Sequence, residues 1–369
     1  MLIFLLFQIA FGEYAWNHNI EGLENGRPMI IAHRGASGTF PAHTRGSYEA
    51  AIDEGADVIE CDLAVSKDRK FVCLHDEYLS SVTDIEDRPE FADRKRLIGT
   101  KRDWFTIDFT LEELTSLKVK AISSRDQQYN FKYNVVSFTE YVQIAKSANR
   151  TIGIYPETKK PDWFEAQIPN YDMETAIVEV LEEMDYRNST DPCFVQSFSW
   201  ESLNQLRNIT DLPLDVITRT FVWHPTKIRF IFKLKLLIYL FKSSTIQPGF
   251  HPGNFSSFDW TTWKFWDELD KLNIYGVGPD KTLIVGKSVD NHVSYVSNLI
   301  QAAHRHNIGV HPYTFKNDNL LFDYKFSSEN EYEKFIKLEV DGFFSDFPET
   351  LVRHLVNRFI LIFYNHFIL

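Results

Sequence analysis

Residues 29–44, MIIAHRGASGTFPAHT, decide the fold because they join a short apolar run to a loop rich in polar and turn-forming residues. The run MII predicts a buried strand, and His33 and Arg34 follow it at the carboxyl end. Barrels of parallel strands carry their chemistry at this end. The stretch therefore favours a barrel enzyme that presents a histidine and an arginine side by side on its first loop.

Two later stretches, 57–62 (DVIECD) and 71–76 (FVCLHD), supply a carboxylate pair, Glu60 and Asp62, and a second histidine, His75. Residues two apart on a strand point to the same face, so both carboxylates of the pair should face the barrel mouth. A third carboxylate, Glu157, ends another predicted strand. Carboxylate oxygens without clustered Cys or His suit Ca²⁺ or Mg²⁺ rather than Zn²⁺.

These motifs, in this order, resemble the glycerophosphodiester phosphodiesterases, and within them the periplasmic, bacterial-type branch. The matching segments are 33–38, 41–44, 55–62, 67–68, 75–76, 153–159, 196–198, 278–280, 310–314 and 341–348. One position departs from the family pattern, since Ala42 stands where the family has glutamate. That glutamate is not among the metal-ligating positions, so we interpret its role as orienting neighbouring groups.

The resemblance implies an α/β fold, an irregular (β/α)₈ TIM barrel spanning residues 13–356, with an insertion after the third strand at about 84–136. Nine strand candidates compete for eight barrel positions, so one is wrong or marks an extra strand. The link at 66–70, between the second and third candidates, is too short for a crossover helix, and we therefore expect one missing helix. Helices are predicted after Thr44, Thr110 and Ser137, and over 173–184, 200–207, 290–305 and 329–338.

By resemblance, the reaction is metal-dependent hydrolysis of glycerophosphodiesters to sn-glycerol 3-phosphate and an alcohol. The implied ligands of a Ca²⁺ or Mg²⁺ ion are Glu60, Asp62 and Glu157. Arg34 and Lys159 would offset the negative charge of the substrate phosphate, because this charge otherwise repels a nucleophile that approaches phosphorus. His33 and His75 would act as an acid–base pair, with the roles open. His43 and His311 are interpreted as supporting residues of the loop and the wall.

Composition limits the partners of the chain. With 369 residues, of which 44% are hydrophobic, it can bury the core of one large domain. The formal net charge of −12 argues against nucleic acid or an anionic membrane as the main partner. We expect a small-molecule glycerophosphodiester as the partner, while the oligomeric state is left open.

Residues 1–12 form an apolar run that ends like a cleavage site, and we interpret them as a signal peptide. Four glycosylation sequons fit a secreted protein, and they begin at Asn149, Asn188, Asn208 and Asn254. We therefore expect a secreted or extracellular location. Three cysteines are too few for a disulfide framework, and Cys61 is interpreted as a core residue.

Two apolar segments, 228–241 and the C-terminal tail 357–369, fit the family pattern poorly. We interpret segment 228–241 either as a lid over the barrel mouth or as an element in peripheral contact with a membrane. Two other functions stay open. One is a lipase D-like phosphodiesterase acting on lysophospholipids or sphingolipids, and the other is a non-catalytic extracellular binding barrel.

Overall fold

The computed structural model describes residues 18–23, 26–122, 124–218, 262–288, 290–324 and 327–367. The predicted first strand is β1 (Met29–Ala32), which pairs in parallel with β2 (Val58–Val65) and β13 (Gly342–Ser345). The parallel order is β12-β9-β8-β7-β6-β2-β1-β13. The remaining strands of this order are β6 (Gly153–Thr158), β7 (Val195–Ser197), β8 (Leu214–Thr218), β9 (Gly276–Pro279) and β12 (Gly309–Val310). Eight parallel strands thus form a nearly closed TIM-like barrel, which confirms the predicted fold class.

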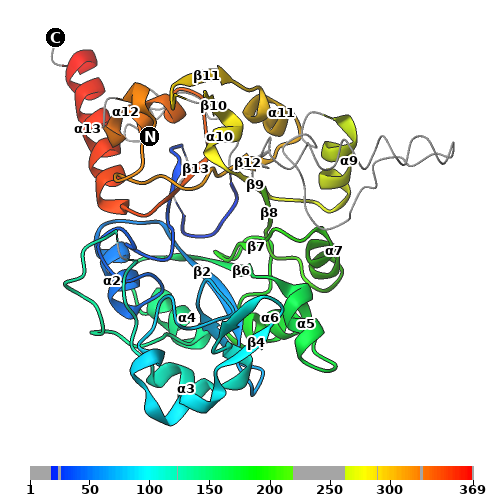
Figure 1. Cartoon of the computed structure of the whole chain (residues 1–369). Helices are drawn as coiled ribbons and strands as arrows, with labels where there is room; N and C mark the ends of the chain where they lie inside the picture. The colour runs from blue at the N-terminus through cyan, green and yellow to red at the C-terminus, as the bar shows by residue number, and fades with distance from the viewer. Residues whose placement is uncertain are drawn as a thin grey trace, which may run out of the picture.

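Helices surround this barrel (Figure 1). They are α2 (Arg45–Asp53), α4 (Phe138–Lys146), α5 (Pro161–Gln167), α6 (Met173–Glu183), α7 (Trp200–Ile209), α9 (Trp263–Lys271), α10 (Lys281–Ile284), α11 (Leu299–Arg305), α12 (Ser328–Ile336) and α13 (Pro348–Phe367). The predicted caps are present, because Thr44 and Ser137 each accept a hydrogen bond from the third backbone N–H of their helix. Sequence-encoded caps therefore set where α2 and α4 begin.

Of the nine strand candidates, the third in chain order is the extra strand. It is β3 (Phe71–Cys73), which runs antiparallel to β2 and lies outside the barrel order. An antiparallel neighbour needs only a short turn, which explains the short link at 66–70. The expectation of a missing helix is wrong for this reason, since α4 lies between β2 and the next barrel strand, β6, along the chain.

The insertion lies between β3 and α4 and forms the lower part of Figure 1. Its elements are the 3₁₀ turns η1 (Ile85–Asp87), η2 (Pro89–Arg94) and η3 (Thr106–Asp108), the hairpin β4 (Arg96–Ile98) and β5 (Lys101–Asp103), and α3 (Leu111–Ser116). Its two ends meet, because the backbone N–H of Cys73 donates to the carbonyl of Val136 at 2.9 Å. The insertion therefore leaves and rejoins the barrel at one place.

Alternation along β2 determines which side chains face the barrel interior. Ile59, Cys61 and Leu63 join the large apolar core that also includes the helices. Val58, in contrast, packs in a separate cluster with the interior residues Tyr155 and Phe344. Glu60 and Asp62 share the parity of Val58 and therefore project inward, as the strand spacing predicts.

One local prediction is wrong, and another is incomplete. The helix predicted over 290–305 exists only as α11, because 293–296 forms β11 (Val293–Val296), paired with β10 (Val285–Lys287). Apolar residues three apart fit a helix face, but β-branched valines also fit a strand once a partner is present. Cys61 is buried as predicted, but it forms a disulfide with Cys73 across β2 and β3, with the Cα atoms 5.6 Å apart.

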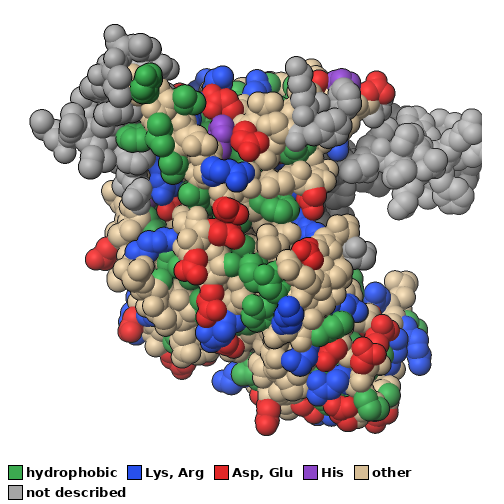
Figure 2. All heavy atoms as spheres, turned by 90° about the vertical axis from the view of Figure 1, so that its left-hand side faces the viewer, with side chains coloured by type: hydrophobic (Ala, Val, Ile, Leu, Met, Phe, Trp, Pro, Cys, Tyr) green, Lys and Arg blue, Asp and Glu red, His purple; other side chains and the backbone are tan. Residues whose placement is uncertain are grey.

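The C-terminal segment 357–367 belongs to α13, whose outer face exposes apolar side chains: Val356, Ile360, Leu361 and Tyr364. In Figure 2 hydrophobic side chains lie at the upper left and again near the middle of the face shown, with acidic and basic side chains interspersed among them. Among the described residues, no helix has both the length and the apolar character to cross a membrane. The signal-peptide prediction at 1–12 and the membrane-contact prediction at 228–241 lie outside the described residues.

Candidate active site

The loop after β1 holds an unusual backbone conformation. Arg34 and His43 have φ values of 61° and 60°, and Gly35 has 77°. Left-handed conformations cost non-glycine residues free energy and persist only where the surroundings hold them. Here Ser47 of α2 donates a hydrogen bond from Oγ to the carbonyl of Arg34 at 3.1 Å, and its backbone lies so close to Gly35 that a Cβ there would clash. The loop is therefore fixed to α2, with His33 and Arg34 at the barrel mouth.

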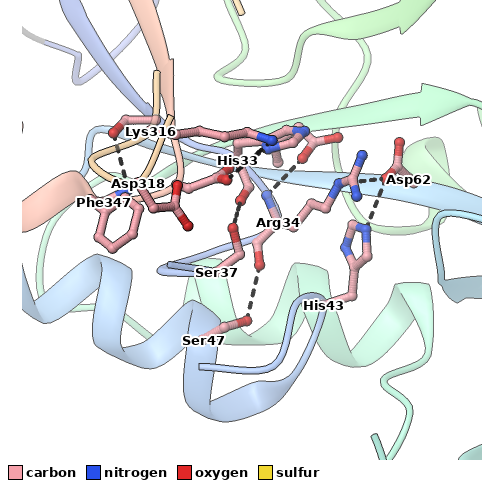
Figure 3. Close-up of polar contacts among 12 residues, drawn as sticks. His33, Arg34, Ser37, His43, Ser47, Asp62, Lys316, Asp318 and Phe347 are labelled. Carbon is pink, nitrogen blue, oxygen red and sulfur yellow. Dashed lines mark hydrogen bonds and ion pairs between the residues drawn. The ribbon is translucent and has the colours of Figure 1, made fainter. Parts of the chain in front are cut away.

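Three carboxylates converge beneath this loop. Glu60 and Asp62 are 1% exposed and Glu157 is 4% exposed, and one oxygen of each lies within 4.8 Å of the others. The backbone N–H of Arg34 donates to Glu60 Oε2 at 2.8 Å, and Arg34 Nε lies 3.0 Å from Asp62 Oδ2. Figure 3 shows Arg34 and His43 both directed at Asp62. β2 and β6 thus bring together the three predicted metal ligands.

Lys159 lies directly after the end of β6 and faces the same cluster. Its Nζ lies 2.9 Å from Glu157 Oε1 and 3.2 Å from Asp62 Oδ1. Burial raises the pKa of Glu157 to about 8, with Asp62 adding to the rise and Lys159 opposing it. Burial and then Asp62 also raise the pKa of Glu60, whereas Lys159 and Arg34 overcome burial and hold that of Asp62 well below its usual range. Two cations therefore compensate three carboxylates incompletely.

The carboxylate cluster fits a divalent cation. Its donor set consists of hard oxygens from three buried side chains, which Ca²⁺ and Mg²⁺ prefer. A cation would offset the repulsion that, in addition to burial, raises the pKa of Glu60 and Glu157. The identity of the ion is not determined by these residues, because both ions accept carboxylate ligands.

His33 is held by Asp346, which lies in the loop directly after β13. Asp346 Oδ1 lies 2.6 Å from His33 Nδ1, and the Asp346 side chain is 2% exposed. Burial and the charge of Arg34 lower the pKa of His33 to about 4, although Asp346 opposes the shift. A neutral imidazole that donates from Nδ1 leaves Nε2 free to accept a proton. His75 also lines the mouth of the barrel, and its Nδ1 lies 3.1 Å from Asp76 Oδ1.

A pocket of about 250 Å³ joins these groups. Six of the seven predicted site residues line it: His33, Arg34, Glu60, His75, Glu157 and Lys159. The seventh, Asp62, lies directly behind them through its contacts with Arg34 and Lys159. The insertion forms one wall with Val82, Val119, Lys120, Ala121, Ile122 and Arg125, and Ala42 also faces the pocket. The structure thus brings all of the predicted residues together, while their roles stay predictions.

Other residues support this site. His43 Nε2 lies 2.9 Å from Asp62 Oδ2 and Nδ1 lies 2.9 Å from the hydroxyl of Tyr48, so His43 contacts a predicted ligand as well as the loop. His311, in contrast, does not line the pocket, because it is fully buried inside the barrel with its Nδ1 3.0 Å from the Tyr155 hydroxyl. Sequence reasoning gave Asp346 no role, although it lies in a matched segment, and it missed the contribution of the insertion because no motif marks it.

A parallel barrel whose mouth combines two histidines, two cations and three buried carboxylates carries the groups that hydrolysis of a phosphoric diester requires. The model of the glycerophosphoryl diester phosphodiesterase family matches residues 33–350, and the chain belongs to this family. The chain is 35% identical to glycerophosphodiester phosphodiesterase GDPD6 of Arabidopsis thaliana over 347 residues, covering 89% of this chain and 86% of that protein.

Two further comparisons agree. A glycerophosphodiester phosphodiesterase of Haemophilus influenzae is 30% identical over 352 residues, with 89% of each chain covered. The structure of an Oleispira antarctica phosphodiesterase in complex with the product sn-glycerol-3-phosphate superimposes with a TM-score of 0.58. It is 18% identical and covers 89% of this chain and 97% of its own, so it supports the fold alone.

Proposed function

We propose that the protein hydrolyses glycerophosphodiesters, such as glycerophosphocholine, to sn-glycerol 3-phosphate and an alcohol, with the aid of Ca²⁺ or Mg²⁺. Family membership gives the reaction class. The observation that carries the proposal is the convergence of both histidines and the carboxylates on one pocket. The sn-glycerol-3-phosphate bound by the Oleispira antarctica phosphodiesterase supports this product.

The residues suggest how the chemistry proceeds. A divalent ion held by the carboxylates would neutralise the phosphate, and Arg34 and Lys159 add positive charge at the same place. His33, held at Nδ1 by Asp346, accepts the proton of the nucleophile at Nε2. The oxygen of this nucleophile, a water molecule, bonds to phosphorus while the phosphorus–oxygen bond to the alcohol breaks, and His75 protonates the departing alkoxide. The contact with Asp346 supports the role of His33 as the base, and the lowered pKa of His33 keeps its imidazole neutral near pH 7.

The decisive experiment offers purified protein glycerophosphocholine and detects sn-glycerol 3-phosphate and choline. Lysophosphatidylcholine and lysosphingolipid in parallel reactions test the lipase D-like alternative. Faster turnover of the lysolipids would favour that alternative. Turnover of none of these substrates would contradict the proposal and favour a binding barrel.

Ala42→Glu should increase activity. Ala42 faces the pocket between Pro41 and His43, in the loop that also carries Arg34. A carboxylate restored there can orient these neighbours, and losing such an orienting group typically costs about 10- to 100-fold in activity or metal affinity. We expect a gain of that order in kcat or in metal affinity, measured by steady-state kinetics and calorimetry. Ala42→Gln is the matched control, because it adds a side chain of similar size without the charge. If Ala42→Glu instead lowers the activity of a fully active protein, Ala42 is an adaptation to another substrate.

We also propose that the protein belongs to the periplasmic, bacterial-type branch of the family and that it is secreted. The Cys61–Cys73 disulfide supports an oxidising compartment, where such bonds persist. Three sequon asparagines, Asn149, Asn188 and Asn208, are exposed. The Haemophilus influenzae relative supports a bacterial link, although the plant relative is more similar in sequence.

Expression in a secretory host tests the location. We expect a mature chain that begins near Glu13, loses mass on enzymatic deglycosylation and, when unfolded without reductant, offers one reactive thiol, because only Cys193 is unpaired among the three cysteines. The measurement is intact-mass spectrometry before and after reduction. An unmodified chain that retains Met1 and three free thiols would contradict the secreted location.

A further inference from the structure

Arg125 belongs to the insertion, yet its contacts lie on the barrel. Its side chain is 9% exposed and lines the pocket. Nη1 donates to the carbonyl of Ser37 at 2.8 Å, Nη2 donates to Asp346 Oδ2, and Nε lies 3.2 Å from Asp318 Oδ2. The guanidinium also lies 5.5 Å from the ring centroid of Phe347. Each of the three guanidinium nitrogens thus contacts a residue of a barrel loop.

Asp346 connects this arginine to the candidate base. One of its carboxylate oxygens contacts His33 Nδ1 and the other contacts Arg125. A carboxylate that is 2% exposed needs compensating charge. Lys316 is the other cation near it, but its Nζ lies 3.8 Å away and outside hydrogen-bonding distance. Arg125 is therefore the cation that fixes the orientation of the carboxylate.

Ser37 connects the same arginine to the loop of His33. Ser37 Oγ donates to the carbonyl of His33 at 2.7 Å, while the carbonyl of Ser37 accepts from Arg125. The insertion therefore holds His33 by two routes, one through its ring and one through its backbone. A wall that only bounded the pocket would need neither contact.

We propose that Arg125 is a positioning residue for the hydrolysis, which holds the imidazole of His33 through Asp346 and Ser37. The proposal rests on the proposed function, since it assigns His33 to proton transfer. Arg125 does not touch the reacting atoms in this role. The insertion would then be required for turnover as well as for shaping the pocket.

The central experiment compares wild type with Arg125→Met and Arg125→Lys. We expect Arg125→Met to lower kcat about 10- to 100-fold, as is typical when a group that orients a functional residue is lost. KM should change little, and Arg125→Lys should recover part of kcat because it restores the charge without the two-pronged geometry. The matched control is Arg94→Met, another insertion arginine, which pairs with Glu113 and does not line the pocket. It should retain wild-type kcat.

An NMR titration of the His33 ring gives a readout that needs no turnover. The charges nearest His33 are Arg34, Asp62 and Asp346, and the last is neutralised by Arg125. Removing Arg125 leaves the negative charge of Asp346 less compensated, which favours the imidazolium. The pKa of His33 should therefore rise from about 4 in Arg125→Met, and the acid limb of the kcat/KM profile should move to higher pH.

A double-variant cycle tests the route. If Arg125 acts through Asp346, Arg125→Met should lower kcat much less in the Asp346→Asn background than it does in wild type. Full additivity, an unmoved His33 titration, or a raised KM with unchanged kcat would overturn the proposal, the last by showing substrate binding instead. Failure of the proposed function gives a different pattern, because wild type then releases no sn-glycerol 3-phosphate while the NMR titration still reports on Arg125. A melting temperature for each variant separates misfolding from both.

Discussion

His33→Ala should lower kcat by about 10² to 10⁴, the range typical of general acid–base groups, without unfolding the protein. His33 contributes its ring to the pocket and little to the core, so its loss leaves the barrel contacts intact. His75→Ala should have an effect of similar size, because the departing alkoxide loses its proton donor. Steady-state kinetics on glycerophosphocholine measure both effects, and circular dichroism checks the fold.

The double variant distinguishes a pair from two independent groups. If His33 and His75 serve the same proton-transfer sequence, the double variant should lose less than the product of the single losses. His292→Ala is the matched control, since this exposed histidine pairs with Asp323 outside the pocket. A single variant with a nearly normal rate would exclude that histidine from the pair.

Removal of the metal should abolish turnover, and Ca²⁺ or Mg²⁺ should restore it. The physical reason is that Glu60, Asp62 and Glu157 are buried together, and Arg34 and Lys159 offset only part of their charge. Asp62→Asn removes the carboxylate that contacts both of these cations, and it should remove metal binding measured by calorimetry as well as activity. EDTA treatment followed by readdition of each ion identifies the ion that the site prefers.

The chain offers a matched control for the metal experiment. Glu165, Asp172 and Glu174 form another group of carboxylates with oxygens within 4.8 Å of one another, and none of them lines the pocket. Glu165→Gln should leave turnover and its metal dependence unchanged. Full activity of the wild type in excess EDTA would eliminate the metal requirement, and so would a fully active Asp62→Asn.

The sequence predicts the barrel and most of the site because local rules determine them. Glu60 and Asp62 face one way because strands alternate, and α2 begins at Thr44 because a side chain there can cap it. The family motifs then place His33 and His75 on neighbouring loops. These features depend on residues close together in the chain, or on motifs whose spacing is visible.

The remaining features depend on tertiary register. The Cys61–Cys73 bond requires that β3 turn back along β2, and the short link at 66–70 is compatible with several arrangements until that direction is known. Asp346 lies 313 positions after His33, and Arg125 comes from a segment without a motif. No local sequence pattern predicts that Arg125 contacts the carboxylate of Asp346.

The meeting of the two ends of the insertion has an evolutionary consequence. Because Cys73 and Val136 are hydrogen-bonded neighbours, a longer or shorter segment between them would still close on the same anchor. Doubling the length of such a loop costs only about 0.6 kcal/mol in closure entropy. Lineages can therefore exchange the part of this segment beyond His75 that walls the pocket, and keep His75 and the carboxylates on β2 and β6 unchanged. Any exchanged wall must, however, bring its own cation to the position now held by Arg125.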